Sequence, residues 1–183
     1  MLKGVLALLR LWWDICLFKR NPEEVPYSPT LLGVVAVCQW GLAYLAWTNS
    51  KTWQYGLVAA TVYIAILLVL PYLILLLARK TARYVQMQAA LLGTSLLLNL
   101  VAAVTIIAAA FIAQKVSFLQ YLVLVVVALM VVWAVSVQGR IYQSALEKPR
   151  FIAICIAVFV LLASSNLFEW TMRLLAWLKD NVL

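Results

Sequence analysis

The sequence contains no histidine, only six acidic residues and only three cysteines. Histidine is the commonest general base and the commonest metal ligand, so its absence removes both from the candidate chemistry. Cys16, Cys38 and Cys155 lie far apart and form no Cys-x-x-Cys pair, which gives no support to a disulfide framework or a zinc site. Among the acidic residues only Glu23 and Glu24 are adjacent, and two neighbouring carboxylates are too few for an oxygen-ligand metal site.

Motifs of known catalytic chemistry are also missing. The sequence contains no P-loop, no dinucleotide-binding fingerprint, no haem motif and no Gly-x-Ser-x-Gly nucleophile turn. We therefore expect no cofactor and no bound metal, and we expect that the protein is not an enzyme.

Charge is scarce and apolar residues are abundant. Charged residues make up 11% of the chain and apolar residues 67%, whereas soluble domains have about 25% and about 45–50% respectively. Such an excess of apolar side chains predicts a membrane protein. The net charge of +8 comes from residues in the connections between apolar runs. This placement favours anionic lipid headgroups as partners and argues against nucleic acid.

Five apolar runs have the length of a membrane-spanning helix. They predict an all-α, polytopic transmembrane bundle over residues 30–167, with spans at about 30–48, 56–78, 89–113, 119–137 and 151–167. Ser28 and Pro29 suit the start of the first helix, and Pro71 predicts a kink in the second. The polar residues between 113 and 119 favour a turn over one long helix.

The two ends of the chain predict amphipathic helices that lie on the membrane surface. Residues 1–29 comprise a helix with a polar face that includes Lys3, Arg10 and Asp14, followed by a proline-rich link. No small-residue cleavage site occurs in it, so we do not expect a signal peptide. Lipid contact is favoured for this helix, and a partner groove is the alternative. Residues 168–183 predict the second surface helix.

The distribution of basic residues predicts an orientation. Ten of the fourteen Lys and Arg residues lie in the N-terminal segment and in the second and fourth connections. The remaining four are Lys51, Lys115, Arg173 and Lys179. By the positive-inside rule the N-terminus is cytoplasmic and the C-terminus lies on the far side, and we expect a bacterial inner-membrane protein.

Two groups of residues are candidate sites. The predicted spans contain no ionisable group apart from Tyr and Cys, which disfavours ion-coupled transport. Their polar or small residues, expected to pack helices or alternatively to face a ligand, are Gln39, Ser95, Asn99 and Ala102. The residues expected to contact lipid headgroups or a partner are Lys3, Arg10, Trp12, Trp13, Arg79, Lys80, Arg83, Arg140, Lys148 and Arg150.

Residues 20–29, with the sequence Arg-Asn-Pro-Glu-Glu-Val-Pro-Tyr-Ser-Pro, precede the first span. Together with the surface helix and the five predicted spans, this segment resembles the bacterial branch of the Yip1 family of small polytopic membrane proteins. Eukaryotic members of that family act in vesicle traffic and bind small GTPases through a long cytosolic N-terminal domain. Only about 29 residues precede the first span here, so GTPase binding is not expected. The prolines predict a stiff link, and a recognition segment is the alternative.

The sequence therefore favours a non-catalytic membrane protein, such as a scaffold, an assembly factor or an accessory subunit of a membrane complex. Other membrane proteins or further copies of the chain are its expected partners. The alternative is a small transporter, channel or lipid-handling protein with a weakly polar site between its helices.

Overall fold

The computed structural model describes residues 2–48, 53–113 and 117–182, which contain helices and no strand. The elements, in chain order, are α1 (Leu2–Cys16), η1 (Pro22–Glu24), α2 (Pro29–Thr48), α3 (Trp53–Leu77), η2 (Thr81–Arg83), α4 (Tyr84–Ala113), α5 (Ser117–Leu146) and α6 (Arg150–Val182). Helices α2 to α6 are each long and apolar enough to cross a membrane. The predicted all-α, multi-pass membrane fold is confirmed.

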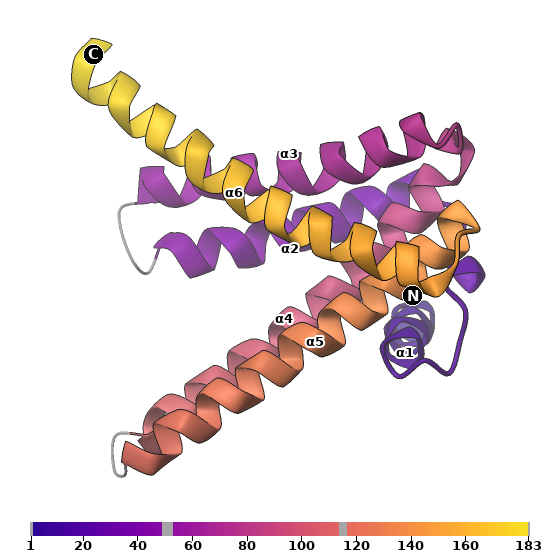
Figure 1. Cartoon of the computed structure of the whole chain (residues 1–183), viewed down its shortest axis with the longest axis horizontal. Coiled ribbons are helices and arrows are strands. Elements are labelled where there is room, and N and C mark those ends of the chain that lie inside the picture. The colour runs from indigo at the N-terminus through magenta and orange to yellow at the C-terminus, as the bar shows by residue number, and fades with distance from the viewer. Residues whose placement is uncertain (1, 49–52, 114–116, 183) are drawn as a thin grey trace.

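The long helices meet at one end of the molecule and diverge toward the other (Figure 1). Helices α4 and α5 run together as one hairpin, whereas α2, α3 and α6 run in a different direction. Helix α1 is seen nearly end-on in the same view, so it lies across the bundle and not alongside the spans. We call the meeting end the basic end, because Lys80, Arg83, Arg140, Lys148 and Arg150 lie there.

The hydrophobic core is concentrated at the basic end. One face of α1, formed by Leu11, Trp12, Ile15 and Cys16, is buried against the bundle. Ala89 and Ala90 of α4 are fully buried, and their small size lets neighbouring helices approach closely. A second apolar face of α1, including Val5, Leu6 and Trp13, stays exposed. Helix α1 can therefore contact the bundle on one face and lipid on another.

Local sequence explains where several helices begin and end. Ser28 Oγ accepts a hydrogen bond from Leu31 N at 3.2 Å, so Ser28 caps α2 as expected and Pro29 occupies the first helical position. Phe18, Arg79 and Glu147, which follow α1, α3 and α5, have φ values of 61°, 56° and 53°. This left-handed conformation closes a helix C-terminus and usually requires glycine. All three sharp helix ends lie at the basic end.

The boundaries of three helices differ from the predictions. Helix α4 begins at Tyr84, before the predicted span at 89–113. Helix α5 continues beyond the predicted span at 119–137 to Leu146, and a short turn that contains Pro149 separates it from α6. The predicted separate helix over residues 168–183 is wrong. Helix α6 runs as one helix over 33 residues, Arg150–Val182. No Gly or Pro occurs in it, and the amphipathic pattern alone gives the backbone no reason to break.

Candidate binding sites

Pro71 inside α3 explains two polar side chains at the start of α4. Pro71 has no N–H, so the carbonyl of Leu67 loses its helical donor. Gln88 Nε2 donates to that carbonyl at 2.8 Å, and Tyr84 Oη donates to the next carbonyl, that of Leu68, at 3.1 Å. Tyr84 and Gln88 lie one turn apart on the same face of α4, so they satisfy two adjacent carbonyls in the turn before Pro71.

A groove of about 410 Å³ lies beside Pro71. Its walls come from all five spans, and most of the lining side chains are apolar. The lining residues with a hydroxyl or carboxamide are Tyr63, Gln88, Ser95, Asn99, Gln138, Tyr142, Ser164 and Ser165. This volume falls within the range of about 300–1,000 Å³ that is typical of small-molecule sites. No Lys, Arg, Asp or Glu is among its described lining residues.

Three carboxamides give the groove its hydrogen-bonding capacity. Gln88 is 1% exposed, and its Oε1 has no partner among the described residues. Within the same part of the chain, no hydrogen bond uses the amide of Asn99 or of Gln138. The serine hydroxyls have less hydrogen-bonding capacity left for a ligand. Ser95 Oγ, for example, already donates to Leu92 O of its own helix at 3.0 Å. The groove can therefore bond an uncharged polar group.

The predicted span residues divide between the groove and other positions. Ser95 and Asn99 line the groove, whereas Gln39 and Ala102 do not. Gln39 is 1% exposed on α2, with its Oε1 unpaired among the described residues. Asn99 is exposed and lines the groove, which suits the alternative of a ligand-facing residue, and its role stays a prediction. The tightly packed part of α4 lies about two to three turns earlier, where Ala89, Ala90 and Gly93 are buried.

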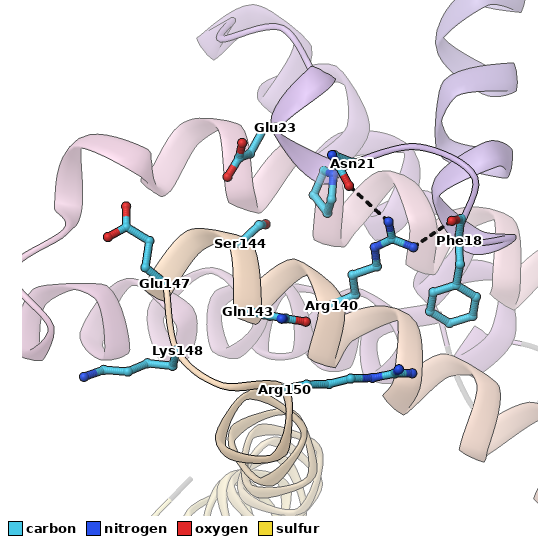
Figure 2. Close-up of a pocket in the computed structure, with 10 residues that line it drawn as sticks. Phe18, Asn21, Glu23, Arg140, Gln143, Ser144, Glu147, Lys148 and Arg150 are labelled. Carbon is cyan, nitrogen blue, oxygen red and sulfur yellow. Dashed lines mark hydrogen bonds between the residues drawn. The ribbon is translucent and has the colours of Figure 1, made fainter.

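A second cavity, of about 660 Å³, lies at the basic end between α5, the start of α6 and the chain around η1 (Figure 2). Arg140 is the most constrained charge in it. Its guanidinium donates to Phe18 O at 2.7 Å and to Asn21 Oδ1 at 3.0 Å, and it lies 5.7 Å from the centre of the Phe18 ring. These contacts join α5 to the segment that follows α1.

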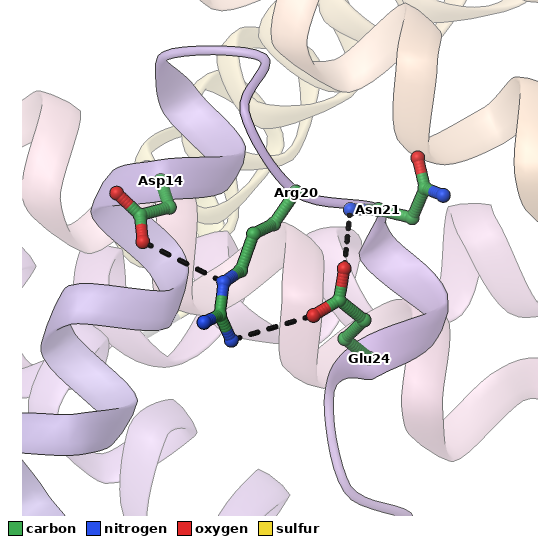
Figure 3. A network of polar contacts seen from close by, with 4 residues as sticks. All are labelled: Asp14, Arg20, Asn21 and Glu24. Atoms are coloured by element: carbon green, nitrogen blue, oxygen red, sulfur yellow. Dashed lines mark hydrogen bonds and ion pairs between the residues drawn. The ribbon is translucent and has the colours of Figure 1, made fainter.

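The segment between α1 and α2 is held against α4 and α5 by further bonds. Gln86 Nε2 donates to Glu23 O and, at 2.8 Å, to Val25 O. Trp133 Nε1 donates to Cys16 O at 2.9 Å. Within the segment, Arg20 pairs with Asp14 at 3.7 Å and with Glu24 at 3.4 Å (Figure 3). The proline-rich link is therefore a strap fixed across the basic end.

An ion-pair cluster joins the two connections of the basic end. Glu147 contacts Lys80 and Arg83, each at 2.6 Å. The hydrogen bond from Lys80 and the nearby positive charge of Arg83 lower the pKa of Glu147 from its usual value of 4.5. Arg83 also donates to Ser144 O at 3.1 Å, so the cluster holds η2 against the end of α5.

The residues expected to contact headgroups have different surroundings. Arg10, Arg79, Lys148 and Arg150 are exposed and Trp13 is 39% exposed, which suits that role. Lys3 lies outside the residues whose side chains are described. The expectation for Trp12 is wrong: it is 4% exposed and packs against Gly93 of α4. Periodicity placed Trp12 on the broad apolar face, but it cannot tell lipid from a neighbouring helix.

Gln88, Gln138 and Tyr142 were missed by the sequence reasoning. Gln88 and Tyr142 lay outside the predicted spans, in the connections, and Gln138 lay at the edge of one. The one available signal was Pro71. A proline inside a membrane helix leaves a carbonyl that must find another donor, and the glutamines of the following connection were the nearest candidates in sequence.

The fold and the groove define a class: a multi-pass helical membrane protein with a weakly polar, uncharged site between its spans. Among the described residues, no group of three or more His, Cys, Asp or Glu side chains could hold a metal ion. No family model, no curated protein and no solved structure matches the chain. The resemblance to the Yip1 family therefore stays a prediction.

Proposed function

We propose that the protein is a non-catalytic membrane protein that binds an uncharged amphiphile, such as a lipid with a hydroxyl or ester head, in the groove between α3, α4, α5 and α6. The observation that carries the proposal is the unpaired, buried Oε1 of Gln88 in a groove without charged side chains. A buried acceptor without a donor is costly, by about 1–3 kcal/mol, and a ligand hydroxyl would remove that cost.

The shape of the groove also favours an elongated ligand. Gln88 and Asn99 lie eleven residues apart on α4, which is about 16 Å at a rise of 1.5 Å per residue. Leu91, Leu92 and Leu98 line the wall of the groove. A polar head near Gln88 and Gln138 with an acyl chain along these leucines would match both kinds of surface.

Photo-crosslinking tests this proposal. Purified protein in nanodiscs is labelled with a diazirine-bearing monoacylglycerol, and the labelled residues are mapped by mass spectrometry. Ser95→Phe fills the groove and should abolish labelling of its walls. Thr105→Phe is the matched control, since Thr105 lies on the same helix, also bonds its own backbone (to Val101 O at 2.8 Å), and does not line the groove. Equal labelling of the two variants contradicts the proposal.

A second arm tests the polar contact. Gln138→Leu removes an amide that the fold does not use, so the free energy of unfolding should change little. The same variant should reduce the preference for the monoacylglycerol over a diazirine-bearing alkane of equal length by about fivefold or more, as expected for one lost hydrogen bond. An unchanged preference would leave the groove as an apolar lipid contact only.

A scaffold, assembly factor or accessory subunit is the second hypothesis, and it needs no occupied groove. It gains support if the two phenylalanine variants label alike while the chain co-purifies from nanodiscs with a stoichiometric partner. We further infer an inner-membrane location with the basic end in the cytoplasm, because that end gathers most of the Lys and Arg residues. Single cysteines at Lys51 and Lys80 should then label from opposite sides, and labelling from one side contradicts the orientation.

A further inference from the structure

We propose that the cavity at the basic end is an anion site that binds a phosphate group. The cavity is distinct from the groove, since α5 contributes Arg140, Gln143 and Ser144 to the one and Gln138 and Tyr142 to the other. The proposal therefore stands or falls independently of the proposed function. Phosphate could come from a lipid headgroup or from a soluble compound, and the chemistry that recognises it is the same.

Arg140 is held in place for this role. Two of its five N–H donors bond Phe18 O and Asn21 Oδ1, and the remaining three are unused. Both of these partners are neutral, so they orient the guanidinium without cancelling its charge. A planar guanidinium fixed in orientation is well suited to phosphate, because it donates two parallel hydrogen bonds without first losing side-chain freedom.

Arg150 and Lys148 supply further positive charge. Figure 2 shows Arg150 extending along the lower side of the cavity, whereas the Arg140 guanidinium points up toward Phe18 and Asn21. Lys148 points away from Arg150 in this view. Between described residues, no ion pair involves Arg140, Lys148 or Arg150. The cavity is therefore lined by Arg140 and Arg150, with Lys148 at its edge, and no described carboxylate pairs directly with any of the three.

The acidic lining residues offset this charge only in part. Glu147 is already paired with Lys80 and Arg83 at 2.6 Å. Glu23 is the remaining carboxylate, and Figure 2 shows it on the opposite side of the cavity from Arg150. Its repulsion should weaken anion binding, so removing its charge provides a test with the opposite sign.

The experiment measures binding of two probes to the full-length chain in dodecyl maltoside at physiological ionic strength, where the Debye length of about 8 Å suppresses diffuse attraction. One probe is inorganic phosphate, and its binding is measured by calorimetry. The other is phosphatidic acid, counted by native mass spectrometry. Arg150→Gln should weaken binding about tenfold or more, as expected for lost charged hydrogen bonds. Lys148→Gln should have a smaller effect.

Two further variants make the result specific. Arg79→Gln removes an exposed charge from the same end but outside the cavity, and it should change affinity less than about twofold. Glu23→Gln should raise affinity about two- to fivefold. If Arg150→Gln weakens the binding of inorganic phosphate, the site takes a soluble ligand. If it weakens only the binding of phosphatidic acid, the site takes a lipid headgroup. The proposal is overturned if wild type binds neither probe saturably, or if Arg79→Gln loses as much as Arg150→Gln.

Discussion

The contact between Gly93 and Trp12 gives a sharp test of how α1 docks on the bundle. A Cβ added at Gly93 would lie 2.5 Å from both Cδ2 and Nε1 of the Trp12 ring, whereas carbon atoms in contact normally lie about 3.5–4.0 Å apart. Trp12 is 4% exposed, so its other neighbours oppose a displacement of the ring. Gly93→Ala should therefore displace Trp12 by about 1 Å, and α1 should move with it.

The expected loss of stability can be separated from helix propensity. Overpacking of this kind costs about 1–3 kcal/mol, while replacing Gly by Ala inside a helix gains roughly 0.5–1 kcal/mol. Gly41→Ala in α2 is the matched control, because its added Cβ would meet nothing within 4 Å. Both variants receive the same propensity gain, so the difference in free energy of unfolding between them should equal the steric cost.

Unfolding by dodecyl sulfate in mixed micelles measures that difference, with tryptophan fluorescence as the readout. Hydrogen exchange of α1 should also accelerate in Gly93→Ala but not in Gly41→Ala. In a Trp12→Leu background the added methyl has space, so the cost of Gly93→Ala should fall to that of the control. The reasoning is refuted if Gly93→Ala is as neutral as Gly41→Ala, or if its cost is the same in both backgrounds.

Three further predictions use other contacts. Gln88→Leu leaves the Leu67 carbonyl unpaired, a loss of about 1–3 kcal/mol, although it also removes the unpaired Oε1, which offsets part of that loss. Pro71→Ala should remove most of that loss by restoring a backbone donor, and an equal loss in both backgrounds in the unfolding assay would contradict this. Glu147→Gln should be less stable than wild type at about pH 7. Because the pKa of Glu147 is lowered from 4.5 in the folded protein, this difference should shrink as the pH falls below 4.5, and a difference that does not shrink in acid refutes the prediction. Burial raises the pKa of Cys16 to about 11, so a water-soluble maleimide should leave it unmodified at about pH 7.5 until the protein unfolds, as read by intact mass.

The sequence did not predict which helix faces contact one another and which face lipid. Apolar residues satisfy lipid and protein neighbours equally well, so the exposure of Trp12 could not be decided from periodicity. The same ambiguity affected α4, where the expected packing residues, Ser95 to Ala102, are less buried than Ala89, Ala90 and Gly93. Helix ends were also uncertain. Polar residues at the start of α4 suggested a connection between helices. Tyr84 and Gln88 are nevertheless helical, and their side chains donate hydrogen bonds to backbone carbonyls in the turn before Pro71.

The sequence by itself determined the class, the number of apolar spans, the capped start of α2 and the separation of α4 from α5. These follow from composition, run length and helix-end residues, which act locally along the chain. The tertiary structure alone decided that the strap is tied to α4 and α5, that Arg140 lies under Phe18 and Asn21, and that three carboxamides from two helices share one groove. Those features join residues up to 122 positions apart, and the physical reason is that such contacts depend on how helices pack, which no local pattern encodes.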